Sequence, residues 1–200
     1  MYKVIGSVKS RTFRVLWMLE ELGLSYEHQN VPPHAAEVLA YNPSGKVPIL
    51  LDDGIAIHDS SAILTYLADK HGKLTAQPGT IERARQDALL HQILDEFDAV
   101  LWTVTRKSLG LKSRPDYQEL SGVFKGEFKN NLARLSNQIA GPFLMGDRIV
   151  VPDIVLGHCG GWAYVAQFPN QSEKFNAYLK RLRSRPAYKM ALAKAKHKAV

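Results

Sequence analysis

The stretch from Asn42 to Leu67 constrains the fold of this chain most, because turn, strand and helix signals follow one another closely in it. It opens with Asn-Pro-Ser-Gly, a turn signal in which proline presets φ and glycine tolerates positive φ. A short apolar strand is predicted over 47–51, and the Asp53-Gly54 dipeptide that follows is typical of a hairpin loop. The returning strand over 55–57 leads to a helix that polar residues can cap and that Gly72 ends. The stretch therefore predicts an antiparallel hairpin followed by a helix.

Pro48, at the start of the first of these strands, has two interpretations. Proline cannot donate a backbone hydrogen bond, so it favours an edge strand. Alternatively, the neighbouring backbone groups of Val47 are left to bind an extended peptide. Only about 5–6% of X-Pro bonds in folded proteins are cis. Taken alone, the dipeptide therefore favours a trans bond and an edge proline without a ligand.

The order of turn, Val-Pro strand, Asp-Gly hairpin and acidic-Ser helix start closely resembles the second half of the thioredoxin-like domain of the glutathione S-transferases. Further matches are Ser10-Arg11, the segment Gly141-Pro142-Phe143, and Gly146-Asp147 with Asp153. The resemblance extends over the whole chain. It implies the cytosolic type and a serine-type subclass of the bacterial or fungal kind.

The resemblance also implies which residues bind glutathione. It implies a cis peptide bond before Pro48 and a hydrogen bond between the backbone of Val47 and the cysteinyl part of glutathione. Asp59 and Ser60 would hold the γ-glutamyl end, and Lys46 is placed in the same site. Glutathione is therefore the expected co-substrate, and no metal is implied.

Periodicity and the resemblance together predict two domains. An α/β thioredoxin-like domain of βαβ-ββα order is expected over 1–74, and an all-α helical bundle over 80–200. Pro78-Gly79 marks the linker between them. The helices predicted for the second domain cover 81–109, 117–139, 153–165, 175–182 and 187–195.

Val150 departs from the family pattern at the start of the central helix of the second domain. The family usually has Ser or Thr at this N-cap position, with Asp three residues later, which is Asp153 here. Valine has no side-chain acceptor, and a missing cap typically costs about 1 kcal/mol. The capping box is therefore expected to be incomplete, while the fold prediction stands.

The chemistry requires a group that stabilises an anionic sulfur. A free thiol with a pKa of about 8.5 is mostly protonated at neutral pH. A hydroxyl at the N-terminus of the first helix can stabilise the thiolate by a hydrogen bond and with the help of the helix dipole. Ser10 is placed for this role and is preferred over Ser7, which lies a turn earlier. A plain N-cap is the alternative role for Ser10.

Two arginines follow Ser10, and either could lower the pKa of the thiol or bind a carboxylate. Arg11 is therefore an alternative catalytic residue. Surface salt bridges from Arg11 and Arg14 to Glu20 or Glu21 are the other interpretation.

The electrophile pocket is expected between the domains, lined by the start of the helical half. Candidates are Trp102, Arg106 and His158, with Trp162, although core packing is the alternative role for each tryptophan. Cys159, the one cysteine of the chain, lies in the apolar central helix and is interpreted as a buried structural thiol and not as a nucleophile.

Composition and motifs exclude several other classes. No HExxH metal motif and no GxxxxGK[ST] phosphate loop is present. One cysteine rules out an internal disulfide. No apolar run of about 18 residues and no signal-peptide core is found, so a cytoplasmic protein without membrane attachment is expected. The net charge of +7 owes much to basic residues over 180–198, which are interpreted as a solvated helix face and not as a nucleic-acid-binding arm.

The resemblance implies a glutathione S-transferase, a homodimeric detoxification enzyme whose glutathione thiolate attacks small hydrophobic electrophiles. A glutathione-dependent peroxidase or thiol reductase is the first alternative. Mixed-disulfide chemistry usually prefers cysteine at the helix start, so Ser10 argues against it. A noncatalytic glutathione-binding interaction module is the second alternative, and the intact set of binding residues disfavours it.

Overall fold

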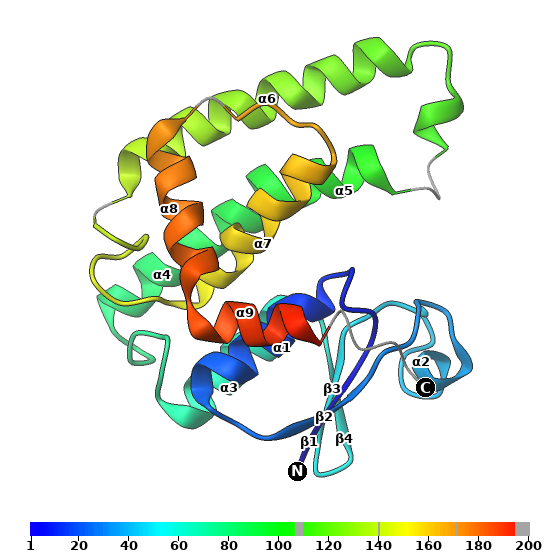
Figure 1. The fold of residues 1–200 in the computed structure, drawn as a ribbon, viewed down its shortest axis with the longest axis vertical. Helices are drawn as coiled ribbons and strands as arrows, with labels where there is room; N and C mark the ends of the chain where they lie inside the picture. The colour runs from blue at the N-terminus through cyan, green and yellow to red at the C-terminus, as the bar shows by residue number, and fades with distance from the viewer. Residues whose placement is uncertain (107–109, 140, 171, 195–200) are drawn as a thin grey trace. The chain divides into compact units, whose positions relative to one another are not determined.

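The computed structural model describes residues 1–106, 110–139, 141–170 and 172–194 (Figure 1). The chain divides into two compact units, of which the first is Met1–Pro78 with the described chain from Arg183 onward and the second is Gly79–Leu182. The division falls in the predicted linker, whereas the last helix groups with the first unit. The domain bounds of 1–74 and 80–200 stay a prediction. The ends of the predicted helices over 81–109 and 187–195, with Lys196 and Lys198, lie outside the described residues.

The first unit is built on a four-stranded sheet. Strands β1 (Tyr2–Ile5), β2 (Tyr26–Gln29), β3 (Ile49–Asp52) and β4 (Ile55–His58) lie in the order β2-β1-β3-β4. β1 and β2 are parallel, and β3 is antiparallel to both of its neighbours. Helix α1 (Thr12–Leu22) connects β1 to β2, α2 (Ala36–Leu39) precedes β3, and α3 (Ser60–His71) follows β4. This βαβ-ββα order confirms the predicted thioredoxin-like arrangement.

The prediction of an edge strand at Pro48 is wrong, because β3 lies inside the sheet. Ile49, the first residue of β3, is paired with Ile5 on one side and with His58 on the other. Three consecutive apolar residues from Ile49 are buried, so both faces of β3 are covered. Pro48 precedes the paired residues, and its missing N–H therefore lies outside the ladder.

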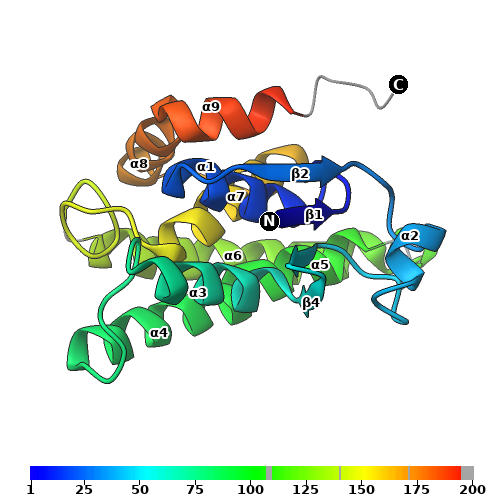
Figure 2. The same ribbon diagram turned by 90° about the horizontal axis from the view of Figure 1, so that it is seen from below.

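Helix α1 is buried along most of its length, as its apolar composition predicts. The last helix, α9 (Pro186–Ala193), packs on it (Figures 1 and 2). The Tyr188 ring centre lies 5.2 Å from that of Phe13 and 5.0 Å from that of Trp17. Arg185, just before α9, donates to both carboxylate oxygens of Glu21 at 2.6 and 2.7 Å. These contacts join residues far apart in the sequence.

The alternative of a surface salt bridge from Arg14 is wrong, because its side chain is fully buried. The two glutamates at the end of α1 have other partners. Glu20 accepts a hydrogen bond from the Tyr26 hydroxyl at 2.7 Å, and Glu21 pairs with Arg185.

The second unit is helical, as predicted. It contains α4 (Ile81–Ile93), the π-helical turn η1 (Leu94–Ala99), α5 (Val100–Thr105), the 3-10 turn η3 (Leu111–Ser113), α6 (Tyr117–Gln138), α7 (Val151–Val165) and most of α8 (Glu173–Ser184). Its described residues hold no strand, only a β-bridge between Phe143 and Gly146. None of the described helices is long and apolar enough to cross a membrane.

The single helix predicted over 81–109 is interrupted by η1, and α5 ends at Thr105. Asn131 on α6 donates to the carbonyl oxygen of Glu96 in η1 at 3.0 Å, which gives a partner to a carbonyl in the irregular turn. In the C-terminal segment Lys180, Arg181, Lys189 and Lys194 are exposed, in agreement with a solvated basic face. Arg183 and Arg185 depart from this prediction, because both are half-buried.

Asp153 compensates for the missing cap at the start of α7. Val150 occupies the N-cap position with extended backbone and no side-chain hydrogen bond. The buried Asp153 carboxylate accepts from the backbone N–H groups of Val150 at 2.8 Å and Leu144 at 3.0 Å, and from the Tyr178 hydroxyl at 2.8 Å. Only the aspartate half of the capping box is thus present, as the sequence predicts. Burial raises the pKa of Tyr178, so its hydroxyl stays a donor.

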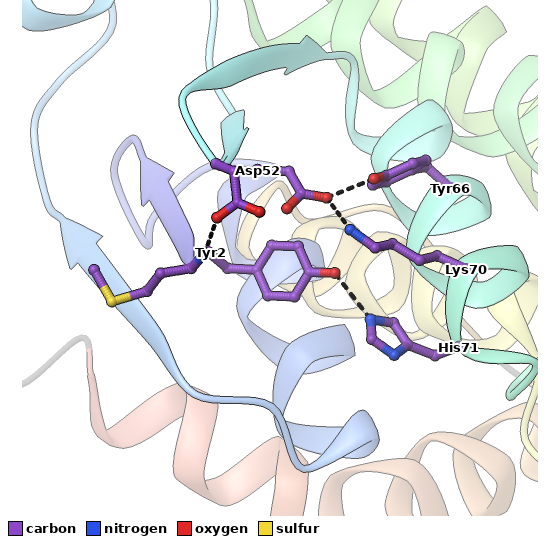
Figure 3. Close-up of polar contacts among 7 residues, drawn as sticks. Tyr2, Asp52, Tyr66, Lys70 and His71 are labelled. Atoms are coloured by element: carbon purple, nitrogen blue, oxygen red, sulfur yellow. Dashed lines mark hydrogen bonds and ion pairs between the residues drawn. The ribbon is translucent and has the colours of Figure 1, made fainter.

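A polar cluster joins the end of β3 to the end of α3 (Figure 3). The Asp52 carboxylate accepts from the Lys70 ammonium group and the Tyr66 hydroxyl. The Tyr2 hydroxyl lies 2.9 Å from His71 Nε2, and Lys70 Nζ lies 5.3 Å from the centre of the Tyr2 ring. The hydrogen bond from Lys70, and then that from Tyr66, holds the pKa of Asp52 below its usual value.

The Asp52 cluster should make stability depend on pH. Because the pKa of Asp52 is lower in the folded state than its unfolded value of about 3.9, its contribution is complete above that pH and is lost as the pH falls through the folded-state pKa. We expect the urea midpoint of the wild type to fall more steeply below about pH 4 than that of Asp52→Asn. Asp53→Asn, at the exposed neighbouring carboxylate, is the control. Parallel profiles for wild type and Asp52→Asn would contradict the expectation.

Candidate functional site

The loop between β1 and α1 places both candidate serines near the start of α1. Ser10 Oγ donates to the Ser7 carbonyl at 2.6 Å and accepts from the Thr12 N–H at 3.1 Å. The Thr12 hydroxyl lies 2.9 Å from Ser10 Oγ. Arg11 occupies the N-cap position in helical conformation, without a capping hydrogen bond from its side chain. Ser10 therefore accepts an N–H at the helix start, and its hydroxyl proton must turn from the Ser7 carbonyl to reach any ligand.

Ser7 is bonded differently. Its Oγ accepts from the Lys9 N–H at 3.3 Å, and among the described residues no acceptor is found for its own proton. Both serines are half-buried. To donate to a sulfur, Ser10 must therefore give up its hydrogen bond to the Ser7 carbonyl, whereas the Ser7 hydroxyl has no such described bond to break.

Gly6 brings this loop against Val47. A Cβ atom built on Gly6 would lie 2.4 Å from Thr12 Oγ1 and 2.7 Å from Val47 Cβ, and the φ of Gly6 is +138°. Only glycine suits such a conformation and such a close approach. The start of α1 and the Val47-Pro48 segment are therefore neighbours.

The Val47-Pro48 peptide bond is cis, as the resemblance implies and the dipeptide alone does not. Val47 is half-buried and Pro48 is buried. Among the described residues no hydrogen-bond partner is found for the Val47 N–H or C=O. These groups are available to an extended ligand, whereas Lys46 beside them is exposed.

Asp59 caps α3. Its Oδ1 accepts from the N–H groups of Ser61 at 2.8 Å and Ala62 at 3.1 Å, and from the Ser61 hydroxyl. The φ of Asp59 is 69°, so the aspartate leaves the strand in a left-handed conformation and stays exposed at the helix start. No described group binds Oδ2.

Ser60 faces inward and contacts Arg14. It is 2% exposed, and its Oγ accepts from Arg14 Nη1 at 3.3 Å. A buried arginine thus links the middle of α1 to the start of α3. From the sequence, Arg14 is interpreted as a residue that acts on the thiol or a carboxylate, or as a partner in a surface salt bridge. No local signal indicates its contact with Ser60.

Two histidines lie beside the site although the sequence assigned them no role. His34 has a φ of 65°, and its N–H donates to the Gly45 carbonyl at 2.8 Å. The His34 ring packs so closely on Gly45 that a Cβ atom built on this glycine would lie 2.0 Å from His34 Nδ1. His28 Nε2 donates to the Gly6 carbonyl at 2.9 Å. Burial lowers the pKa of His28, which favours the neutral ring in this support of the loop.

The candidates of the helical unit gather on α5 and α7. The ring centres of Trp102 and Trp162 are 6.4 Å apart in an edge-to-face arrangement. The Arg106 guanidinium carbon lies 5.9 Å from the centre of the Trp102 ring, and the His158 ring centre lies 6.0 Å from that of Trp162. All four are half-buried. Cys159, one residue after His158, is fully buried with Sγ 4.0 Å from Asp98 Oδ2, as expected for a structural thiol.

The described residues contain no group of three or more His, Cys, Asp or Glu side chains that could hold a metal ion.

Comparison with known proteins identifies the family. The family model for the N-terminal domain of glutathione S-transferases matches residues 10–70. The zeta class glutathione S-transferase of Euphorbia esula is 30% identical over 155 residues, which are 74% of this chain and 68% of that protein. The chain belongs to the glutathione S-transferase family. Glutathione S-transferase 3 of Schizosaccharomyces pombe is 40% identical over 70 residues, which are 32% of this chain and only 28% of that relative's length.

The similarity to a solved glutathione transferase structure includes both halves of the chain. A crystal structure of a glutathione transferase from Methylococcus capsulatus str. Bath matches with a TM-score of 0.83 and 30% identity, and the match covers 98% of this chain and 99% of that chain. The predicted α/β half and helical half are therefore both confirmed.

Proposed function

We propose that this glutathione S-transferase family member is an active transferase, which binds glutathione as co-substrate and joins its sulfur to small hydrophobic electrophiles. The observation that carries the proposal is the approach of the Ser10 loop to Val47 across Gly6. It brings a hydroxyl at a helix start close to backbone groups that an extended peptide can pair with. No metal is needed for this chemistry.

Glutathione would bind as a short strand along Val47, whose N–H and C=O pair with the cysteinyl part. Its γ-glutamyl end would reach the start of α3, where backbone N–H groups and the helix dipole favour a carboxylate. Asp59 uses Oδ1 as a cap, which leaves Oδ2 for the glutathione ammonium group. Lys46 supplies an exposed positive charge beside Val47.

Ser10 would donate its hydroxyl hydrogen to the glutathione sulfur and lower the pKa of the thiol. Ser7 is the alternative donor in the same loop, and Arg11 could favour the thiolate through its charge. In the reaction the sulfur forms a bond to the electrophilic carbon, the leaving group departs with its electron pair, and the thiol proton passes to solvent. Trp102, Arg106 and His158 are the proposed contacts of the electrophile.

Asp59→Asn should separate glutathione binding from helix capping. Asparagine keeps an Oδ1 acceptor for the N–H groups of Ser61 and Ala62 but removes the negative charge. We expect glutathione affinity to fall roughly 10- to 100-fold by calorimetry, with a weaker dependence on salt, while the thermal midpoint changes little. The KM for glutathione should rise more than kcat falls, because these atoms do not change charge in the reaction.

Ser60→Ala is the companion variant. Ser60→Ala should also weaken glutathione binding. Because Ser60 Oγ accepts from the buried Arg14, the thermal midpoint of this variant should fall as well, unlike that of Asp59→Asn. Glutathione affinity equal to the wild type in both variants would show that Asp59 and Ser60 only support the helix.

A noncatalytic module would bind glutathione without turnover, and a peroxidase or reductase would turn over peroxides or disulfides in preference to electrophiles. A panel of electrophiles, peroxides and disulfides assayed with glutathione separates the three.

We also propose a cytoplasmic homodimer of the serine type, from the family resemblance. Sedimentation as a monomer at micromolar concentration would count against the dimer.

A further inference from the structure

We propose that the electrophile site of this protein selects planar aromatic compounds that carry a carboxylate, with Arg106 as the group that binds the anion. The proposal rests on the proposed transferase function and refines its substrate class. Its basis is the grouping of Arg106 with the indole rings of Trp102 and Trp162 on α5 and α7.

Arg106 is a cation without an anionic partner among the described residues. It directly follows α5, its backbone N–H donates to the Trp102 carbonyl at 3.0 Å, and its side chain is half-buried. Its Nε atom is buried and finds no hydrogen-bond partner. A buried donor left unpaired is unfavourable, so a ligand that accepts from Nε gains more than it would from a solvated arginine. The guanidinium fork matches a carboxylate, which can accept two parallel hydrogen bonds.

The surroundings of Arg106 suit a flat ring. Trp102 and Trp162 meet edge to face at 6.4 Å, and both keep part of their surface exposed. An aromatic substrate can stack on or meet such rings edge to face, with an added stabilisation beyond the buried area. The His158 ring centre lies 6.0 Å from that of Trp162, so a polar ring adjoins the pair.

Two structural roles for Arg106 compete with this proposal. A cation at the end of a helix interacts favourably with the helix dipole, and a guanidinium over an indole ring makes a cation–π contact. Both account for the position of the charge. Neither gives the buried Nε an acceptor.

Arg183 on α8 provides a matched control. Its Nε atom is also buried and unpartnered. It belongs to the other compact unit of the chain and is not among the residues proposed to contact the electrophile. Arg183→Gln therefore removes the same kind of group outside the proposed site.

The test compares a chlorodinitrobenzoate with its methyl ester, at saturating glutathione. In both, the sulfur forms a bond to the ring carbon, chloride leaves with the bonding electron pair, and the thiol proton passes to solvent. Each kcat/KM is divided by the uncatalysed rate constant, because the carboxylate and ester activate the ring differently. We expect the wild type to prefer the carboxylate about tenfold or more, and Arg106→Gln to lose this preference because its kcat/KM falls much more on the carboxylate than on the ester. Arg106→Lys should retain part of it, and Arg183→Gln all of it.

A binding measurement keeps this proposal separate from the proposed function. Dinitrobenzoate and its methyl ester lack the leaving group, so their binding, followed by tryptophan fluorescence without glutathione, requires no turnover. Tighter binding of the carboxylate by about tenfold in the wild type, abolished in Arg106→Gln, supports the anion site even if the transferase activity is absent. Equal affinities for acid and ester, or the same loss in Arg183→Gln as in Arg106→Gln, would overturn it.

Discussion

Ser10→Ala lowers kcat for glutathione conjugation roughly 10- to 100-fold, because a hydrogen bond from the hydroxyl to an anionic sulfur is worth about 1.5–3 kcal/mol. The affinity for glutathione changes much less, since the hydroxyl acts on sulfur and not on the ends of the tripeptide. The thiol of bound glutathione also has a higher pKa in the variant, so the rising limb of the pH–rate profile moves to higher pH. Steady-state kinetics over a range of pH, with calorimetry of glutathione, measures all three effects.

Ser7→Ala is the comparison that makes this result specific. Ser10 Oγ donates to the Ser7 carbonyl, which the alanine variant at position 7 retains, whereas the Ser7 hydroxyl is lost. If Ser10 activates the thiol, Ser7→Ala should keep most of the rate and the pH profile. A larger loss in Ser7→Ala than in Ser10→Ala would transfer the role to Ser7. An unchanged pH profile in both variants would leave backbone N–H groups as the donors.

Asp153→Ala lowers the free energy of unfolding by roughly 3–5 kcal/mol, because it leaves several buried hydrogen-bond donors without an acceptor. The N–H groups of Leu144 and Val150 and the hydroxyl of Tyr178 all lose their acceptor. The carboxylate is fully buried, so water does not replace it without opening the start of α7. Urea unfolding followed by circular dichroism measures the change.

Two further variants test the same contacts in smaller steps. Tyr178→Phe removes one donor and leaves the carboxylate bonded to the two N–H groups, so it should cost much less than Asp153→Ala. Val150→Thr adds the missing N-cap acceptor where the backbone already has the extended conformation of an N-cap, and should stabilise the protein by up to about 1 kcal/mol. An Asp153→Ala protein within 1 kcal/mol of the wild type would show that the start of α7 does not depend on this carboxylate.

The candidate site could be predicted in part, because some of its signals are local. Ser10 at a helix start and the Val47-Pro48 segment before a strand follow from turn, cap and strand chemistry within a few residues. The contact between Arg14 and Ser60 joins side chains 46 positions apart, and no local pattern indicates it. The same holds for the approach of Val47 to Gly6, which the sequence marks only by a glycine.

The residues Trp102, Arg106 and Trp162 of the helical unit show the same division between local and tertiary signals. Trp102 and Arg106 are one helical turn apart, so their proximity follows from α-helical spacing. Their grouping with Trp162 depends on how α5 and α7 pack. The unpartnered Nε of Arg106, which suggests an anionic ligand, is visible only once its surroundings are known.

The sequence by itself determined the order and type of the elements, since these depend on short-range forces. Gly23 and Gly72 end their helices in the left-handed conformation, and Asp53-Gly54 closes the hairpin. The tertiary structure alone decided which strand lies inside the sheet, and that α9 packs on α1 through the pair of Arg185 and Glu21. Strand pairing and helix packing join segments far apart in the chain. Their choice depends on the total apolar surface that is buried, which no local stretch of sequence encodes.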